Sequence, residues 1–420
     1  MPEAYIIDAV RTPRGIGKPG KGALSHCHPQ HLGATVLGAL RDRNGMDTPE
    51  VDDIIWSTSI QRGLQGSNLG RMSALLAGFD MSVSGMTIDR FCGGGITATG
   101  IAAGQIMAGL EDCIIAGGTE MMSLHPAIFA MEAQANEGRP YGTHGGNPDL
   151  LALHPFSQNG VAADAIAAME GITRADTDAF ALESQQRAAR AIAGGRFGRS
   201  IVPVRNRDGG IVLGRDEYPR PGTTAEGLAA LEPSFGKIAA MAMLEDGTTY
   251  GDMIRRVCPG LHWQPIHHAG SSSGIVDGSA ALLLASAGHA ARRGWTPRAR
   301  IVASVNMGDS PTLSLNAPVP AARKALDRAG LATSDIDVWE VNEAFAVVAE
   351  KFIRDLRLDR DRVNINGGAI ALGHPIGATG AILIGTALDE LERSGGRYAL
   401  ITMCAAGGMA PAIIIERVRP

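Results

Sequence analysis

One order of hydrophobic and polar patterns runs along the chain twice. Short apolar runs bounded by turn residues predict strands, and apolar residues spaced three and four apart predict helices. In the first half, a helix is predicted at residues 31–43, and a second one begins beside Cys92 and ends at residue 108. The strands predicted in this half cover residues 5–10, 51–57, 85–91 and 112–116.

The second half repeats this order. Helices are predicted at residues 319–329 and again after residue 375. The strands predicted here cover residues 300–304, 336–342, 362–366, 398–403 and 410–416. Two matching units indicate a duplicated α/β fold, in which helices cover the faces of mixed sheets.

A long insertion separates two strands of the first unit, because strand 112–116 finds its partner only at residues 280–285. Within the insertion one clear helix is expected at residues 174–193, where Thr173 and Asp176 form a capping box. The rest is expected to be irregular. The predicted domains are an N-terminal core repeat of residues 1–121 and 275–296, an inserted loop domain of residues 122–274 and a C-terminal core repeat of residues 297–420.

Composition narrows the class of protein. The chain has 420 residues, of which 45% are hydrophobic and 55 are glycines, and this is typical of a compact α/β protein. A net charge of −5 argues against general nucleic-acid binding. Five scattered cysteines predict a reducing compartment, here the cytoplasm. We find no signal peptide and no apolar run of about 18 residues, and therefore expect no membrane span.

The first candidate for chemistry is Cys92, which lies between a predicted strand and three glycines that open a helix. Unpaired N–H groups at a helix N-terminus stabilise an anion. We therefore expect this position to lower the pKa of the thiol and to make it reactive. The alternative is an inert buried cysteine in a glycine-rich turn, because single cysteines often serve as small hydrophobic residues.

Further candidates lie at strand ends of the second unit, where the catalytic groups of α/β sheets gather. A histidine between Gly373 and Pro375 is unusual for a merely structural turn, whereas Cys404 has a structural alternative. Asn342 would orient water or an oxyanion, or else cap a helix. Two cysteines and His374 suit acyl transfer, in which one thiolate takes the acyl group and the second thiol moves a proton.

Two other signals carry less weight. The histidines at 26, 28 and 31 and Cys27 have metal-like spacing, but they lack a second ligand cluster. A polar loop before a helix explains them, and we predict no metal site. The glycine-rich turns do not fit the dinucleotide fingerprint, and no Walker sequence is present.

Seven short motifs follow one another along the chain. They are RTP at 11–13, the Cys92 segment, GGTEMMS at 117–123, SGIVDG at 273–278, NEAF at 342–345, NGGAIALGHP at 366–375 and CAAGG at 404–408. In this order they resemble the thiolases, the acyl-CoA C-acyltransferases, over essentially the whole chain. The resemblance implies the thiolase fold, coenzyme A and acyl-CoA as substrates, no permanently bound cofactor, and a homodimer or homotetramer.

The resemblance also implies a role for each candidate. Cys92 would carry the acyl group as a thioester, and His374 would activate it. Cys404 would take or return the α-proton in the carbon–carbon step. Asn342, through a water, would join His374 in binding the thioester oxygen of the other reactant. The backbone N–H groups of Cys92 and Ala406 would form a second oxyanion site.

Contacts to coenzyme A are less specific in the sequence. The resemblance implies that Ser273 lies beside the pantetheine arm. The phosphates need cations, and our candidates are Arg220 and, in the insertion, Lys237, Arg255 or Arg256. For each of these the alternative is an ordinary solvated surface charge.

Departures from the family pattern concern the choice of substrate. Ala406 stands where many members have glycine, and Gln158-Asn159 stands where short-chain members often have His-Met. Ser271 replaces a frequent asparagine, and residues 237–266 resemble an insertion relative to short-chain members. These differences favour a substrate other than acetoacetyl-CoA.

The function expected from these residues is that of a 3-oxoacyl-CoA thiolase of fatty acid metabolism, with a ping-pong course through acyl-Cys92. The alternatives are a biosynthetic acetoacetyl-CoA thiolase, a non-catalytic acyl-CoA-binding homologue and a Cys/His hydrolase. The presence of all three reactive residues disfavours the non-catalytic homologue. A hydrolase would release acyl groups without needing free coenzyme A.

Overall fold

The structure, a computed structural model, describes residues 2–135 and 145–418. Within these residues ten strands form one mixed sheet. They are β1 (Ala4–Arg11), β2 (Gly15–Ile16), β3 (Asp53–Ser57), β4 (Met86–Ile88), β5 (Cys113–Met121), β8 (Val276–Ser286), β9 (Ala299–Gly308), β10 (Ile336–Val341), β11 (Tyr398–Thr402) and β12 (Met409–Arg417). The order across the sheet is β10-β11-β12-β9-β1-β8-β5-β3-β4, and β2 pairs with β8.

The sheet has two halves with the same strand pattern. Its central strands β1 and β9 are joined by only two facing pairs, Tyr5 with Arg300 and Ile6 with Ala299. Moving outward, β8 and β12 are antiparallel to these central strands, and β5 and β11 are antiparallel to β8 and β12. The next strands, β3 and β10, run parallel to β5 and β11. This symmetry confirms the predicted duplication.

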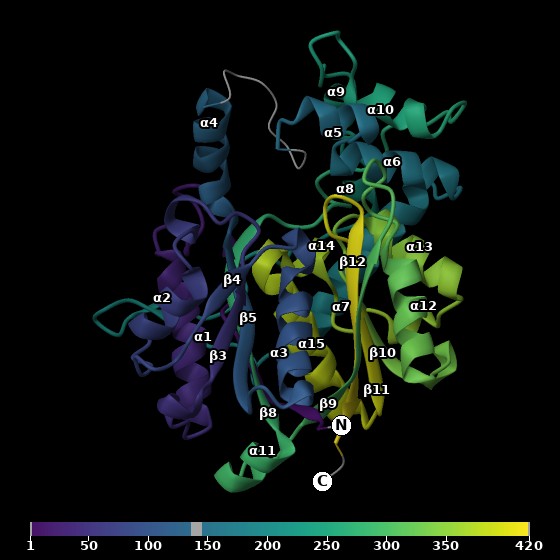
Figure 1. The fold of residues 1–420 in the computed structure, drawn as a ribbon. Coiled ribbons are helices and arrows are strands. Elements are labelled where there is room, and N and C mark those ends of the chain that lie inside the picture. The colour runs from purple at the N-terminus through teal and green to yellow at the C-terminus, as the bar shows by residue number, and fades with distance from the viewer. Residues whose placement is uncertain (1, 136–144, 419–420) are drawn as a thin grey trace.

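Two helices fill the space between the halves, and other helices cover the outer faces, so that five layers alternate (Figure 1). The inner helices are α3 (Gly94–Ala108) and α15 (Ile376–Ser394). The outer helices are α1 (Pro29–Arg43) and α2 (Leu69–Leu76) on the N-terminal half, and α12 (Pro318–Ala329) and α13 (Ala346–Leu356) on the C-terminal half. Shorter elements are α11 (Ala287–Arg293), α14 (Ala369–Leu372) and the 3₁₀ turns Thr48–Glu50, Gly63–Gln65, Phe91–Gly93, Met122–Leu124, Thr333–Asp335 and Arg360–Arg362.

The inner helices cross where each has a glycine. A Cβ atom on Gly380 of α15 would lie 2.2 Å from the backbone nitrogen of Ile96 on α3. A Cβ atom on Gly95 of α3 would lie 2.9 Å from the backbone nitrogen of Ala381. Only residues without a side chain permit so close an approach of two backbones. The crossing therefore sets the distance between the two halves.

The predicted strand at residues 362–366 is wrong. Residues 360–362 form a 3₁₀ turn, and only an isolated parallel bridge joins Val363 to Trp339 of β10. Asn364 has a φ of 48°, in the left-handed region that ends an extended run. Its side-chain amide instead bonds both backbone groups of Val341, each at 2.9 Å. The side chain of Asn364 thus forms the two hydrogen bonds with Val341 that the backbone of a neighbouring strand would otherwise form.

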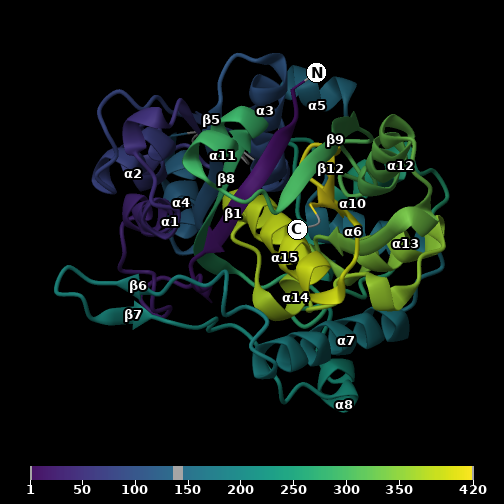
Figure 2. The ribbon, with the colours of Figure 1, turned by 90° about the horizontal axis from the view of Figure 1, so that it is seen from below.

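The insertion is more helical than predicted. The expected helix is present as α7 (Arg174–Ala193), with the predicted capping box of Thr173 and Asp176. The other elements are α4 (His125–Ala135), α5 (Pro148–Leu153), α6 (Asn159–Met169), α8 (Ala225–Ala229), α9 (Gly236–Ala239), α10 (Tyr250–Val257), β6 (Val204–Arg205) and β7 (Ile211–Leu213). The β6–β7 hairpin projects away from the core (Figure 2).

Helix α6 lacks the expected sequence signal because residues 160–167 are all buried, so no polar face alternates with an apolar one. Helix α10 did have a signal, since Thr249 and Asp252 form a second capping box.

β5 and β8, which flank the insertion, are neighbours in the sheet. The proposed domain boundaries depend on this pairing, because the chain leaves the sheet after β5 and re-enters it beside β5 as β8.

Among the described residues, no helix has both the length and the apolar character that a membrane crossing needs.

Candidate active site

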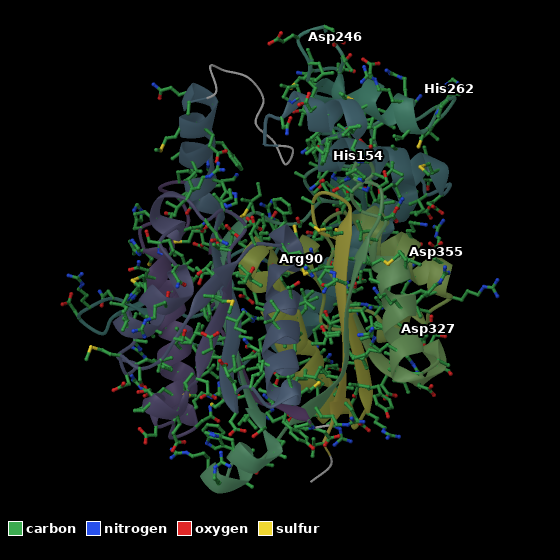
Figure 3. All side chains as sticks on the ribbon, viewed as in Figure 1. Arg90, His154, Asp246, His262, Asp327 and Asp355 are labelled. Carbon is green, nitrogen blue, oxygen red and sulfur yellow. The ribbon has the colours of Figure 1, made fainter. Side chains whose placement is uncertain are left out.

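Cys92 lies in the 3₁₀ turn Phe91–Gly93, directly before α3, as the sequence predicts. The turn is held by Asp89, whose Oδ1 accepts a 2.7 Å hydrogen bond from the backbone nitrogen of Phe91. A Cβ atom on Gly94 would lie 1.8 Å from the hydroxyl of Ser57 on β3. The glycine therefore lets the start of α3 pack directly against the sheet. Arg90, two residues before Cys92, lies near the upper end of α3, below the insertion (Figure 3).

The thiol of Cys92 is not acidified, contrary to our expectation. Burial raises its pKa to about 12, and the negative charge of Glu120 adds to this rise. The backbone N–H groups of Cys92 itself and of Ala406 act in the opposite direction. In this site the cost of removing a thiolate from water outweighs the stabilisation by N–H groups at the turn. The thiolate must therefore form together with a proton acceptor.

Cys404 lies just after β11, with only 1% of its surface exposed. Burial raises its pKa above that of an ordinary thiol, and the neighbouring Cys92 raises it further. The two thiols are thus close enough to influence each other, although they are 312 positions apart in the sequence. A tight turn holds the Cys404 loop, because Ala405 and Met409 exchange backbone hydrogen bonds of 2.7 and 3.1 Å.

The loops that carry the two cysteines pack against each other. A Cβ atom on Gly93 would lie 2.7 Å from Cδ of Pro411 and 3.4 Å from Cβ of Ala405. Ala406 follows in this loop, and its backbone N–H lowers the pKa of Cys92. The methyl group that distinguishes Ala406 from glycine leaves this donor in place.

His374 is 6% exposed and lies in the turn before α15. Its Nδ1 is 2.7 Å from the hydroxyl of Thr379, which itself donates to the carbonyl of Pro375 at 3.0 Å. Nδ1 is therefore the protonated nitrogen, and Nε2 is free to accept a proton. Burial lowers the pKa of His374 to about 4, while Glu120 raises it and Arg14 lowers it. The ring is neutral at pH 7 and is available as a base.

Asn342 lies directly after β10, where its backbone nitrogen donates to Thr402 at 3.1 Å. Its side-chain nitrogen is 3.4 Å from Nε2 of His374, a distance at the long end of a hydrogen bond. The alternative that Asn342 caps a helix is wrong, because the N-cap of α13 is Phe345. The amide instead faces the same space as the histidine.

Glu120 at the end of β5 is a site residue that we quoted only as part of a motif. Its buried carboxylate accepts hydrogen bonds from the backbone nitrogens of Ser59 (2.8 Å) and Gly377 (2.9 Å). It also accepts one from Gln65 at 2.8 Å and contacts Nε2 of His125 at 3.0 Å. Against burial, these partners hold the pKa of Glu120 below its ordinary value. The carboxylate thus ties the N-terminal half to the first turn of α15, beside His374.

The expected coenzyme A residues Ser273 and Arg220 lie on two segments that contact each other through Tyr218. The backbone nitrogen of Ser273 donates at 3.0 Å to the carbonyl of Ala344, two residues after Asn342. Arg220 is exposed, and its guanidinium lies 5.4 Å from the ring centre of Tyr218. That ring packs on Gly274, where a Cβ atom would lie 2.3 Å from it. Tyr218 therefore connects Arg220 to the Ser273 loop.

The other three candidate cations lie on α9 and α10 of the insertion, and all are exposed. Arg255 pairs with Asp252, and Arg256 donates to the hydroxyl of Thr248 at 3.1 Å. Lys237 is close in sequence to Phe235, whose ring contacts that of Phe345 with centres 5.7 Å apart. The start of α9, and not Lys237 itself, is thereby placed against the NEAF motif.

Two departures from the family pattern, Gln158 and Ser271, have a local structural role. Gln158 caps α6, with its side chain accepting from the backbone nitrogen of Gly160 at 2.7 Å. Ser271 accepts at 3.1 Å from the backbone nitrogen of His268.

Two of the three histidines with metal-like spacing also have structural partners. His28 caps α1, and Nε2 of His31 is 2.7 Å from the carbonyl of Arg205. Across residues 2–135 and 145–418, no group of three or more histidines, cysteines or acidic residues is placed to hold a metal ion.

Comparison with known proteins identifies the family. The family model "Thiolase, N-terminal domain" matches residues 4–288, and "Thiolase, C-terminal domain" matches residues 295–417. The chain is 41% identical to a beta-ketoadipyl-CoA thiolase of Acinetobacter baylyi and 42% identical to a 3-oxoadipyl-CoA/3-oxo-5,6-dehydrosuberyl-CoA thiolase of Escherichia coli, each over 100% of both chains. It is 40% identical to the steroid 3-ketoacyl-CoA thiolase FadA6 of Mycobacterium tuberculosis, over 99% of this chain and 95% of that protein.

The fold agrees with a solved structure of the same family. The crystal structure of the Bacillus anthracis acetyl-CoA acetyltransferase superposes with a TM-score of 0.82 at 33% identity, over 100% of this chain and 99% of that one. Sequence motifs, duplicated core and whole-chain relatives therefore agree. The chain belongs to the thiolase family and is an acyltransferase of the 3-oxoacyl-CoA thiolase kind.

Proposed function

We propose that this enzyme cleaves 3-oxoacyl-CoA with coenzyme A in two half-reactions, through a thioester on Cys92. The observation that carries the proposal is the convergence of two thiols, a neutral histidine and an amide from both halves of the core. The pKa of Cys404 responds to Cys92, and Asn342 lies 3.4 Å from His374. A nucleophile, a base and a separate acid are the groups that acyl transfer with carbon–carbon cleavage requires.

In the first half-reaction His374 takes the proton of Cys92, and the thiolate attacks the 3-oxo carbon. The bond between C2 and C3 then breaks, which leaves the acyl group on Cys92 and an enolate of acetyl-CoA. Cys404 donates its proton to C2 of that enolate. In the second half-reaction the Cys404 thiolate takes the proton of a new coenzyme A, whose sulfur attacks the acyl thioester. Acyl-CoA leaves, and the Cys92 thiolate takes back the proton that His374 holds, which restores all three groups.

Two oxyanion sites would stabilise these steps. Asn342 and His374 would bind the thioester oxygen on which the enolate charge develops, with a water as intermediary. The backbone N–H groups of Cys92 and Ala406 would bind the oxygen of the acyl group on Cys92. These two N–H groups lower the pKa of Cys92, which supports the second assignment. Donors that stabilise the thiolate of Cys92 also lie near the oxygen of an acyl group bonded to its sulfur.

Coenzyme A would enter past the Ser273 loop, as substrate and not as a resident cofactor. Ser273 would lie beside the pantetheine arm, and Arg220 would meet a phosphate. The contact of Tyr218 with Gly274 supports this pairing. The exposed cations Lys237, Arg255 and Arg256 are weaker candidates, since Arg255 already pairs with Asp252.

The acyl chain is proposed to be longer than that of acetoacetyl-CoA. Support comes from the names of the relatives, which include beta-ketoadipyl-CoA and steroid 3-ketoacyl-CoA thiolases, and from the helical segment around α9 and α10. A second candidate is acetoacetyl-CoA thiolase, favoured by the structural likeness to an acetyl-CoA acetyltransferase.

A homodimer or homotetramer in the cytoplasm completes the proposal. Among the described residues the edge strand β4 pairs on one side only, and Met81, five residues before it in the sequence, is 83% exposed. Exposed apolar residues next to an unpaired strand edge are typical of an interface. All five cysteines are free, which suits a reducing compartment. Native mass measurement would test the assembly.

The deciding experiment is coenzyme-A-dependent cleavage of a series of 3-oxoacyl-CoAs, from acetoacetyl-CoA to longer, carboxylated and ring-bearing chains. We expect cleavage of the longer members and loss of it in Cys92→Ala. Intact mass should detect the acyl group on the wild-type protein alone. If the folded wild-type protein cleaves none of the series, or if the acyl group appears on Cys92→Ala, the proposal is wrong.

A further inference from the structure

A small cavity lies beside Asn342, and neither reactive cysteine lines it. It measures about 10 Å³, and its walls include Arg14, Glu340, Asn342 and Thr379. This volume suits a single water, and a buried water needs at least two polar partners. The cavity wall supplies more than that number, from β10, from the turn after β1 and from α15.

The side chains at this cavity are deeply buried and incompletely bonded. Glu340 and Asn342 are each 1% exposed, and Arg14 is 4% exposed. Among the residues that the structure describes, neither oxygen of Glu340 has a hydrogen-bond partner, and the same is true of Oδ1 of Asn342 and Nε of Arg14. Each unpaired buried polar group costs about 1–3 kcal/mol. Four such atoms around one cavity point to a shared ligand.

Glu343, the residue directly after Asn342, provides the contrast. It is equally buried, but its oxygens accept from Ser184 at 2.6 Å, from Asn364 at 2.9 Å and from the backbone nitrogen of Ile370 at 3.1 Å. Glu343 therefore has an evident structural role. Glu340 has no comparable set of partners, and packing alone does not explain a carboxyl group there.

The surroundings of Glu340 favour its neutral form. Burial raises its pKa well above the ordinary value, and the nearby Glu343 and Glu390 raise it further, against Arg14 and Arg187. A neutral carboxyl group donates one hydrogen bond and accepts others, whereas a carboxylate only accepts. It can therefore donate toward an oxygen, which an ionised glutamate cannot do.

We propose that Glu340 orients the Asn342 amide through one water held in this cavity, with Arg14 as a second donor to that water. The carboxyl O–H and the Nε–H of Arg14 donate to the water, and the water donates to Oδ1 of Asn342. This inference rests on the proposed function, because it assigns Glu340 a positioning role for the oxyanion site.

The orientation matters because the two ends of an amide have almost the same shape but opposite hydrogen-bonding character. With Oδ1 bonded on the cavity side, the NH₂ group of Asn342 faces Nε2 of His374, as the 3.4 Å contact has it. A donor then faces the place where the enolate charge develops. With the amide turned round, an oxygen would face that charge and oppose it.

A double-mutant cycle tests the inference, with the best 3-oxoacyl-CoA of the wild-type enzyme as substrate. Glu340→Leu, with or without Asn342→Ala, compares the effect of the carboxyl group in two backgrounds. In the wild-type background we expect kcat to fall about tenfold with KM little changed, since removing one oxyanion donor outright costs about 10²–10³. In the Asn342→Ala background we expect no further fall. Equal factors in the two backgrounds, or no fall in the first, would overturn the proposal.

Control variants separate positioning from stability. Glu340→Gln keeps a neutral donor and should retain kcat within about threefold of wild type, which an ionised Glu340 would not predict. Glu390→Gln is the matched control, because Glu390 is buried to 1% but bonds Asn366 and Arg393 instead of the cavity. It should lower the melting temperature without lowering kcat. Glu340→Met is run in parallel so that one misfolded variant does not decide the result.

The readouts also distinguish this inference from the proposed function. If the wild-type protein cleaves 3-oxoacyl-CoA and Cys92 is acylated, the proposed function holds whatever Glu340 does. Loss of kcat in Glu340→Gln equal to that in Glu340→Leu would show that a charged group is needed, and would overturn the neutral-donor assignment. Rescue by glutamine together with non-additivity is the result expected.

Discussion

The two halves of the core each build a turn before an inner helix, and they fill it differently. In the N-terminal half β4 leads through Phe91–Gly93 into α3 and places Cys92 there, whereas in the C-terminal half α14 leads into α15 and places His374 there. Burial moves both groups toward neutrality, with a pKa of about 12 for Cys92 and about 4 for His374. In the resting site both Cys92 and His374 are therefore uncharged, and they form no thiolate–imidazolium pair.

The carboxyl groups behind the two turns differ as well. Glu120, near both turns, has donors from several elements, and its pKa lies below the ordinary value. Glu340, behind Asn342 and His374, has no partner among the described residues, and its pKa lies well above it. Burial is similar in the two cases. The difference lies in the hydrogen-bond donors, which outweigh the cost of burial at Glu120 and are lacking among the described residues around Glu340.

The largest expected effect comes from removing the nucleophile of the N-terminal turn. Cys92→Ala should lower kcat for thiolysis about 10⁴-fold or more, because no group remains to carry the acyl intermediate. Cys258→Ala, at a half-buried cysteine of the insertion, is the matched control and should keep wild-type activity. The measurement is coenzyme-A-dependent cleavage together with intact mass. Comparable losses in both variants would contradict the assignment.

Removing the thiol of the C-terminal half should have a smaller and more selective effect. Cys404→Ala should still form the acyl enzyme when given a simple acyl-CoA, since Cys92 and His374 remain. It should lose carbon–carbon cleavage by about 10³-fold, because no acid protonates the enolate. Rapid mixing with mass detection separates the two steps. Unchanged thiolysis would remove Cys404 from the mechanism.

The crossing of the two inner helices can be broken directly. Gly380→Ala places a Cβ atom 2.2 Å from the backbone nitrogen of Ile96, so the free energy of unfolding should fall by about 3 kcal/mol. The loss should appear in chemical denaturation. Wild-type stability in this variant would mean that the helices are free to move apart.

The pH dependence of acylation reports the neutral state of His374. Its pKa of about 4 means that the ring stays unprotonated at pH 5–8, so the rate should show no step near pH 6.5. The sign for stability follows from the same depressed pKa. Between pH 6.5 and 4 the unfolded chain binds the extra proton, so the contribution of His374 is complete above pH 6.5 and is lost as the pH falls toward 4. An inflection of the acylation rate near pH 6.5 would contradict this assignment.

The smallest expected effect is a stabilisation on the same helix that contributes Gly95. Gly104 of α3 is exposed, and a Cβ atom there would meet nothing within 4 Å. Gly104→Ala should therefore raise the free energy of unfolding by about 0.5–1 kcal/mol, through helix propensity. Together with Gly380→Ala it separates the cost of a close crossing from the general cost of glycine. A loss of stability in this exposed variant would show that α3 has another contact there.

Local sequence was sufficient for most regular elements of the core. The strands and helices predicted in its two halves are present except at residues 362–366, where Asn364 and its side-chain bonds to Val341 replaced a strand. The outer helices α2 and α13 were not predicted. Helix α7 has the predicted bounds because its capping box lies within four residues. Helix α6 was missed because it is buried on all sides, and an element without a polar face leaves no period in the sequence.

The sequence by itself determined the family, the duplicated fold and the residue types that the chemistry needs, because motifs and patterns are short-range properties. Only the tertiary structure decided the protonation, orientation and hydrogen-bond partners of these residues. The pKa of Cys92 rises and does not fall, Asn342 faces His374 and caps no helix, and Glu340 lacks the partners that Glu120 has. Desolvation and hydrogen bonding are sums over neighbours that are distant in sequence, so they appear only once the two halves are packed together.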